Sequence, residues 1–323
     1  MLNLRRTADS ESAKPMTSAN FSGLSPSDHL RRLCDFERAA SEGQSTHLNS
    51  LVETFRDRLK SVSSSEIVAL LAQAIDSSAT EDECGYWCCI SELHHRAEAV
   101  IFEACAAWAA SPEPRTRKAS ADVLSQLGYR EEHPFAQQSQ PILERLLEDN
   151  EIPIVEAALI ALGHLGVGEL SAIAGCAKRP EAQVREAGVR ALLSRDEPMA
   201  RRMLIDLSRD AEPEVRDWST FGLGTCSKID SPEIRAALVA RLADEDDETR
   251  GEALFGLAKR KDPRVLPAIS RELVRDEVSE RAIEAAGQMP HESLLPALEA
   301  LLSSSPGDQY ILDAIAACRG VAR

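Results

Sequence analysis

A cluster of cysteine and histidine side chains is the first place in this sequence where chemistry could occur. The stretch CGYWCCISELHH contains Cys84, Cys88, Cys89, His94 and His95. Thiolate and imidazole are the ligands that zinc prefers. However, Cys84 and Cys88 lie one turn apart only in a helix, no second Cys-x-x-Cys pair follows, and free cysteine is often buried. We expect core residues here and no cofactor, with Cys84, Cys88 and His94 as weaker metal candidates.

Arginine side chains form a second group of candidates, because the chain is otherwise acidic, with a net charge of −16. A guanidinium forms forked hydrogen bonds with carboxylates, so a row of them could hold an acidic segment of a partner protein. The alternative is a solvated face with local ion pairs to Asp206, Glu233 and Glu272. The arginines in question are Arg201, Arg202, Arg209, Arg235, Arg241, Arg264, Arg271 and Arg275.

The composition excludes several classes of function. The acidic charge argues against general binding of nucleic acid or anionic membranes, since like charges repel. No stretch is long and apolar enough for a transmembrane helix. The first residues lack a hydrophobic signal region, so we expect a cytoplasmic protein with a flexible leader over residues 1–25, starting at Met1 or Met16. Without a secretion signal, we expect the eight cysteines to be reduced.

The elements that position these side chains follow from an internal repeat. The stretches EVRDWSTFGLG (214–224) and ETRGEALFGLA (248–258) are nearly the same. We define one anchor position in each copy, and anchors recur every 29 to 38 residues, a spacing typical of repeat arrays. A small residue stands three positions after six of the seven anchors, and Leu or Ala stands seven positions after each. The anchors are Arg117, Val155, Arg185, Arg216, Arg250, Ser279 and Tyr310.

Each anchor lies in a helix with a small and leucine-rich face, and a second apolar helix follows it. Pro141, Pro232 and Pro263 are expected near the starts of second helices, where a proline loses no helical hydrogen bond. Asp149, Asp210 and Asp244 precede the next anchor by six residues, where they could cap a helix or pair with a neighbouring arginine. Each unit is thus a helical hairpin that completes its core by stacking on its neighbours.

The repeat resembles the HEAT family, and within it the short bacterial type also seen in phycobilin-lyase-like subunits. The resemblance rests on a branched residue before the anchor arginines Arg117, Arg185, Arg216 and Arg250, and on helices ending in ALG or GLG (161–163, 222–224). It implies an all-α, right-handed α-solenoid of stacked helical hairpins, with second helices on the concave surface. It also implies protein binding. Arg117, Arg185, Arg216 and Arg250 would form a ladder with Asp149, Asp210 and Asp244.

We therefore expect an irregular helical N-terminal cap with a degenerate repeat over residues 26–111, then a HEAT-like array of about seven units over residues 112–323. The favoured function is a non-catalytic scaffold or adaptor that binds another protein on its concave face, with no nucleic acid or membrane as partner. The alternative, from the same resemblance, is a subunit of a phycobilin-lyase-like or cofactor-attachment complex. The candidate contacts are Arg202, Arg235, Arg271, Arg275 and Trp218.

Trp218 needs a separate interpretation because other anchors carry mostly small or charged residues at the equivalent position. With Asp217 it is similar to the aromatic and acidic pair of HEAT-fold DNA glycosylases, but the negative charge of the chain opposes DNA binding. Two other interpretations stay open, a packed tryptophan and a protein-contact tryptophan. The nearby GLG glycines are expected to allow close helix contact. An enzyme is the less favoured class, since no recognisable nucleotide-binding or hydrolase motif occurs.

Overall fold

The computed structural model describes residues 24–39, 45–77 and 84–321, and every regular element in these ranges is helical. The expected all-α solenoid class is confirmed, while the expected flexible leader lies almost entirely outside the described residues. None of the described helices is long and apolar enough to cross a membrane. The chain divides into two compact units: Met1–Ala107 with Leu127–Pro134, and Trp108–Gln126 with Phe135–Arg323.

Unit 1 is a small helical bundle. Its apolar core includes Leu51, Phe55, Ile67, Cys89 and Leu93, all at most 1% exposed. Burying such side chains contributes roughly 1.5–3 kcal/mol each, which is enough to order short helices that are marginal alone. The helices are α1 (Pro26–Ala39), α2 (Ser45–Leu59), α3 (Ser64–Ser77), α4 (Cys84–His94) and α5 (Ala99–Trp108), whose last residue belongs to unit 2, and a short η2 (Tyr129–Glu131) follows later in the chain.

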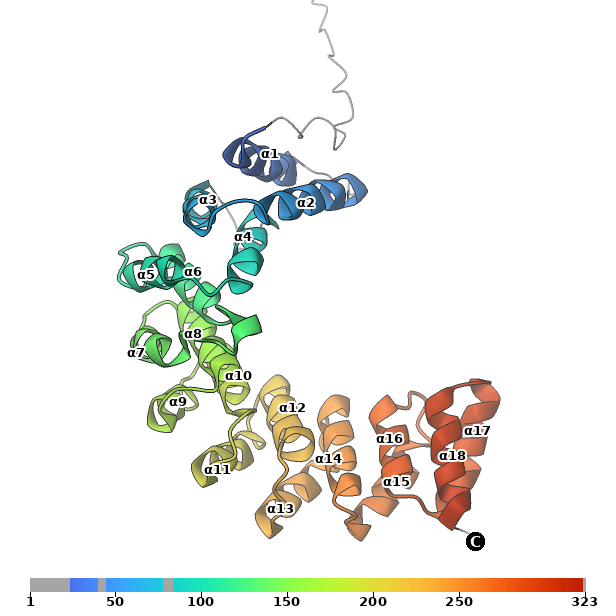
Figure 1. Ribbon diagram of the computed structural model, residues 1–323. Helices are drawn as coiled ribbons and strands as arrows, with labels where there is room; N and C mark the ends of the chain where they lie inside the picture. The colour runs from blue at the N-terminus through green and yellow to red at the C-terminus, as the bar shows by residue number, and fades with distance from the viewer. Residues whose placement is uncertain (1–23, 40–44, 78–83, 322–323) are drawn as a thin grey trace, which may run out of the picture. The chain divides into compact units, whose positions relative to one another are not determined.

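Unit 2 is the repeat array, built from helical hairpins in chain order (Figure 1). The helices that carry the anchors come first in each pair. They are α6 (Pro114–Leu124), α8 (Ile152–Leu165), α10 (Ala182–Leu192), α12 (Pro213–Phe221), α14 (Asp247–Lys259), α16 (Glu280–Gln288) and α18 (Gln309–Val321). The second helices are α7 (Ala136–Leu146), α9 (Leu170–Cys176), α11 (Pro198–Leu207), α13 (Pro232–Arg241), α15 (Leu266–Glu272) and α17 (Leu295–Ser304), with short turns η3 (Gly222–Cys226), η4 (Pro263–Val265) and η5 (Glu292–Leu294).

Prolines mark most helix starts as expected, with one exception. Pro232 occupies the first turn of α13 and Pro263 begins η4, where the missing N–H costs nothing. Pro141 instead lies inside α7, which begins at Ala136. The residues before Pro141 are Ala, Gln and Ser, and these continue the helix for more than a turn ahead of the proline. The prediction that the second helix begins at Pro141 was therefore wrong.

The two sets of helices form two rows within unit 2. Each anchor helix packs against the next anchor helix, while neighbouring second helices meet much less. In Figure 1 the anchor helices α8, α10, α12 and α14 lie on the inner side of the bend within this unit, and α7, α9, α11 and α13 lie on its outer side. The resemblance had led us to expect second helices on the concave side. The small faces of the anchor helices explain the reversal, because they let these backbones approach more closely.

Glycines make the closest of these approaches, as the sequence predicted. A Cβ on Gly256 would lie 2.6 Å from the Cα of Gly224 in the preceding repeat. A Cβ on Gly163 would lie 2.9 Å from the Cα of Ala191. No real Cβ sits at such distances, so only glycine permits these backbone contacts. The Gly-rich stretch at 222–226 is a π-helical turn, closed by the Ser227 N–H donating to the Gly222 carbonyl at 2.9 Å.

Candidate partner-binding surface

Three anchor arginines join successive repeats through aspartates. Arg117 donates to both carboxylate oxygens of Asp149, Arg185 to both of Asp210, and Arg216 to both of Asp244, with N–O distances of 2.7–3.2 Å. Each guanidinium also donates to two backbone carbonyls before its own helix. Each aspartate also accepts the N–H two residues later. Most donors of these guanidinium groups are engaged inside the fold, so they serve the architecture.

The charges of this ladder influence one another's titration. The hydrogen bonds from Arg117 and Arg185 lower the pKa of Asp149 and Asp210. For Asp244 burial acts in the opposite direction, but hydrogen bonds from Arg216 and a backbone N–H still lower the pKa overall. Arg250 departs from the pattern, because it pairs with Asp247 and Glu272 instead. The Val155, Ser279 and Tyr310 copies lack the arginine, so the ladder is discontinuous.

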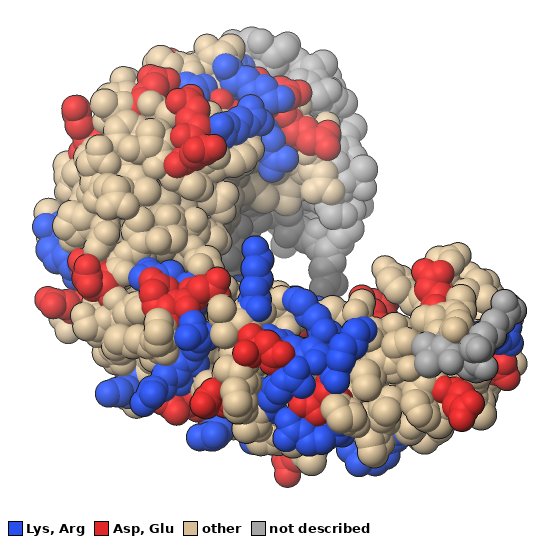
Figure 2. All heavy atoms as spheres, turned by 60° about the horizontal axis from the view of Figure 1, so that its bottom comes forward, with Lys and Arg blue, Asp and Glu red and all other residues tan. Residues whose placement is uncertain are grey.

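The arginines of the second helices are mostly engaged in local ion pairs. Arg235 contacts both Asp230 and Asp262, at 2.7 and 3.0 Å. Figure 2 shows basic side chains gathered with acidic ones set among them. Arg202 forms no side-chain hydrogen bond with the described part of the chain, and Arg271 reaches only the Leu242 carbonyl, at 3.4 Å. The other pairs are Arg241 with Asp244, Arg264 with Asp262, and Arg275 with Glu272.

The cysteines of the cysteine and histidine cluster lie in or at the edge of the core of unit 1, whereas His94 and His95 are half-buried. Cys88 and Cys89 are at most 1% exposed on α4, and Cys84 is half-buried at its start. Burial of this kind suits the packing interpretation. Among residues 24–39, 45–77 and 84–321, no three His, Cys, Asp or Glu side chains are grouped to hold a metal ion.

A different set of side chains stands out on the anchor-helix row, centred on Trp218 of α12. The Arg190 guanidinium of α10 lies over the Trp218 ring, 4.1 Å from its centroid. Phe221, one turn along α12, meets the same ring edge-on at 5.6 Å. Trp218 and Phe221 are both partly exposed. A cation over an aromatic face is worth roughly 0.5–2 kcal/mol, so the ring is held in place before any partner arrives.

The next two anchor helices, α14 and α16, repeat this arrangement, but here the arginine is on the later helix and the aromatic ring on the earlier one. The Arg281 guanidinium of α16 lies 4.8 Å from the centroid of the Phe255 ring of α14. Arg281 also donates to Glu252 at 2.7 Å and to Glu284 at 2.9 Å. The second oxygen of Glu252 accepts the Thr225 hydroxyl at 2.9 Å. Two aromatic positions, on α12 and α14, are thus flanked by stacked arginines from α10 and α16.

Asp217 is the unusual acid of this surface. One of its carboxylate oxygens is buried without a hydrogen-bond partner in the described part of the chain. Burial is the main cause that raises the pKa of Asp217 to about 7, and the charges of Glu252, Asp246 and Glu248 add to it, while Arg281 opposes it. The group therefore changes charge near neutral pH.

The sequence contained a signal for this surface that extends beyond Trp218. Trp218, Glu252 and Arg281 all stand two positions after their anchors. The residues five positions after the anchors are Arg190, Phe221, Phe255 and Glu284. Both positions vary between repeats, and the side chains five positions after the anchors are half-buried in α10, α12, α14 and α16. Only the first of them, at Trp218, entered the sequence-based prediction.

Comparisons with known proteins agree with this architecture. Residues 202–281 and 235–319 match the model of the HEAT repeats family. This region therefore carries HEAT repeats, in a chain whose described part folds as a helical solenoid. Protein YibA of Escherichia coli, from strain K12 and from O157:H7, is 38% identical to this chain over 113 residues, which is 35% of the chain. The matched region spans only about 40% of these curated relatives.

The X-ray structure of E. coli YibA resembles this HEAT-repeat chain more extensively. The two share 22% sequence identity and a TM-score of 0.64, over 87% of this chain and 98% of the other. At this identity the likeness establishes the fold alone. None of these matches names a phycobilin lyase or a binding partner, so function has to be argued from the HEAT surface itself.

Proposed function

We propose that this protein is a non-catalytic scaffold that binds a partner protein through the Trp218 surface, defined as Arg190, Trp218, Phe221, Phe255 and Arg281. The observation that supports it is the pairing of partly exposed aromatic rings with stacked arginines on four successive anchor helices, α10, α12, α14 and α16. Tryptophan and arginine dominate the binding energy of protein interfaces, because they combine large apolar area with oriented donors. The inner side of a bent array also lets one partner touch several repeats.

The proposal predicts that Trp218→Ala strongly weakens partner binding. Truncating a central interface tryptophan typically costs about 2 kcal/mol or more, which weakens binding by roughly thirtyfold. The test is a pull-down from a lysate of the native host with wild-type bait, the Trp218→Ala variant and a Tyr310→Ala control. Tyr310 is also an exposed aromatic of an anchor helix, but it lies outside the Trp218 surface. Circular dichroism checks that both variants remain helical.

Each outcome decides between surfaces. A protein that is captured by the wild type and by Tyr310→Ala, but not by Trp218→Ala, supports the proposal. Retention by Trp218→Ala together with loss by Arg202→Glu/Arg271→Glu favours the second-helix arginines, which stay a separate prediction with Arg235 and Arg275. Recovery of no protein by the wild-type bait contradicts the scaffold function. Cofactor attachment, the alternative inferred from resemblance, would require copurification with a coloured tetrapyrrole, and no observation here favours it.

A further inference from the structure

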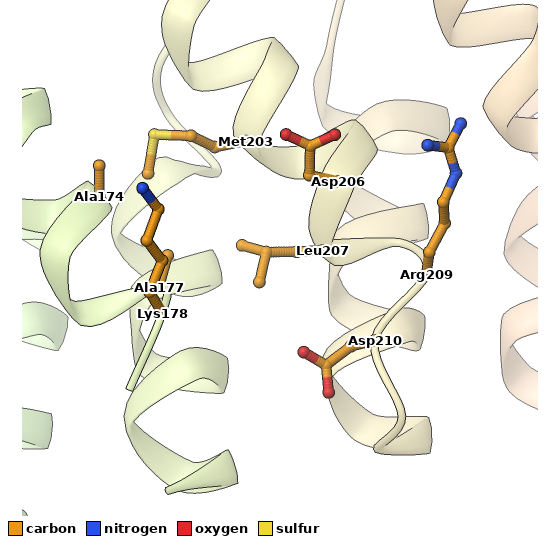
Figure 3. Close-up of a pocket in the computed structure, with 8 residues that line it drawn as sticks. All are labelled: Ala174, Ala177, Lys178, Met203, Asp206, Leu207, Arg209 and Asp210. Atoms are coloured by element: carbon orange, nitrogen blue, oxygen red, sulfur yellow. The ribbon is translucent and has the colours of Figure 1, made fainter. Parts of the chain in front are cut away.

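A cavity opens on the other row of unit 2, between the second helices α9 and α11 (Figure 3). Its volume is about 310 Å³. Ala174 and Ala177 line it from one hairpin, and Met203 and Leu207 line it from the next. These four side chains give the cavity an apolar surface. It exists because α9 is short and rich in small residues, so this pair of outer helices does not close up.

Two cations stand at the edge of this cavity, and neither has a hydrogen-bond or ion-pair partner among the described residues. Lys178 and Arg209 both line it and are exposed. In Figure 3 the Lys178 side chain extends toward Met203, alongside the apolar surface. Neither side chain forms an ion pair or a hydrogen bond with any residue of the described ranges, whereas most arginines on this row are paired. An unpaired cation beside an apolar cavity leaves both kinds of contact available to a ligand.

The carboxylates of the cavity do not cancel these cations. Asp210 lines the cavity, but its two oxygens accept from Arg185 at 2.8 Å each, and this pairing lowers its pKa. Asp206 is exposed and forms no ion pair within the described residues. Lys178 and Arg209 therefore face one uncommitted acid. The local charge is positive in a chain whose net charge is −16.

We propose that this cavity binds a short acidic segment of a partner protein, with one aliphatic side chain in the cavity and neighbouring carboxylates against Lys178 and Arg209. The size fits this occupant, since 310 Å³ is at the lower end of ligand sites, which hold roughly 300–1,000 Å³. Arginine and lysine supply the donors that carboxylates need. The site is separate from the Trp218 surface and does not depend on the function proposed for it.

Fluorescence anisotropy of the full chain with labelled peptides tests the site. The first probe has one leucine flanked on both sides by glutamates, the second replaces the leucine by glycine, and the third replaces the glutamates by lysines. We expect the first probe to bind best, and the loss of leucine to weaken binding about tenfold, in line with removal of one buried aliphatic group. Nonspecific electrostatics favours the lysine probe, so a preference for glutamate has to come from a local site.

Variants then locate the binding. Lys178→Glu/Arg209→Glu is expected to weaken the glutamate–leucine probe at least tenfold, as roughly expected for reversing two contacting charges. Ala174→Trp, which fills the cavity, should do the same without changing charge. The control Lys228→Glu/Arg319→Glu makes the same change in net charge at exposed side chains away from the cavity and should bind normally. Trp218→Ala should also bind normally, which separates this site from the Trp218 surface.

Several results would overturn the assignment. Absence of binding by wild type, equal affinity in the Lys178/Arg209 variant, or tighter binding of the lysine probe each excludes an acidic segment here. Equal binding of the leucine and glycine probes excludes the cavity as the contact.

Discussion

At the scale of single residues, the two kinds of charged group in unit 2 differ in how completely the fold uses them. Arg117, Arg185 and Arg216 donate most of their N–H groups to an aspartate and two backbone carbonyls, so they stabilise the stacking of repeats. Arg190 and Arg281 instead lie over partly exposed rings and pair with Glu186 and with Glu252 and Glu284, respectively. Their side chains are 39% and 28% exposed, against 13–18% for the three ladder arginines. Residue type alone does not separate these roles. The partners do.

Asp217 gives a prediction about pH. Its pKa in the folded protein, about 7, lies above its ordinary value of 3.8, so the folded state holds the proton more tightly than the unfolded state. The contribution of Asp217 to the free energy of unfolding should therefore fall as pH rises from about 4 to about 7. Asp217→Asn removes this ionisation and should stabilise the protein at about pH 8, on the order of 1 kcal/mol because the side chain is partly exposed.

Urea unfolding of wild type and Asp217→Asn at both pH values measures this effect. The advantage of the variant should nearly vanish at about pH 4, where the wild-type group is protonated in the folded protein. An equal advantage at both pH values would contradict the ionisation argument and point to a packing effect.

At the scale of elements, η3 is joined to α14 in two ways, by the contact between Gly224 and Gly256 and by the buried side chain of Arg260. Arg260, whose side chain is only 6% exposed, donates to the carbonyls of Leu223 and Gly224 within η3, at 2.7 and 2.9 Å. It reaches the Ser227 and Ile229 carbonyls as well, at 3.1 Å each. The guanidinium therefore satisfies backbone groups that a π-helical turn leaves unpaired. Burial lowers its pKa.

Gly256→Ala tests this junction. The new Cβ would lie 2.6 Å from the Gly224 Cα, and backbone on both sides cannot move cheaply. We expect a loss of about 2–3 kcal/mol in unfolding free energy. The matched control is Gly175→Ala in α9, where no atom lies within 4 Å of the new Cβ. That change should stabilise the chain by roughly 0.5–1 kcal/mol, because alanine restricts the unfolded chain and favours the helix.

The comparison is made by thermal or urea unfolding of both variants. If Gly256→Ala does not lower the unfolding free energy relative to Gly175→Ala, the two helices can separate without cost. That result would contradict the close packing described here.

At the scale of the whole molecule, stability is distributed over repeats that contact only their neighbours. Anchor helices in the middle of unit 2, such as α10 and α14, pack against an anchor helix on each side. The last one, α18, packs against α16 alone within this row. Repeat arrays of this kind gain stability from each interface, so end repeats open first.

Hydrogen exchange followed by mass spectrometry should reflect this order. Amides in α10 and α14 should exchange slowest, and those in α18 at least about tenfold faster, because opening an end repeat breaks one interface rather than two. Equilibrium unfolding should also depart from a single two-state transition. Uniform protection along unit 2 with one sharp transition would show that the array unfolds as a single cooperative body.

The sequence by itself determined the helical class, the repeat and the close glycine contacts. Each depends on local spacing: small residues three positions after the anchors and a period near 30 residues dictate what one hairpin buries. The sequence also singled out Trp218, because a tryptophan breaks the pattern at its position.

Only the tertiary structure decided which row faces inward and which charges remain available. Arg235 and Arg202 look alike in sequence, yet Arg235 is held by Asp230 and Asp262 while Arg202 forms no ion pair within the part of the chain that the structure describes. The pairs Arg190 with Trp218 and Arg281 with Phe255 join residues 26 to 28 positions apart, across separate helices. Such pairings depend on how hairpins stack, and local spacing does not encode this because it reports one helix at a time.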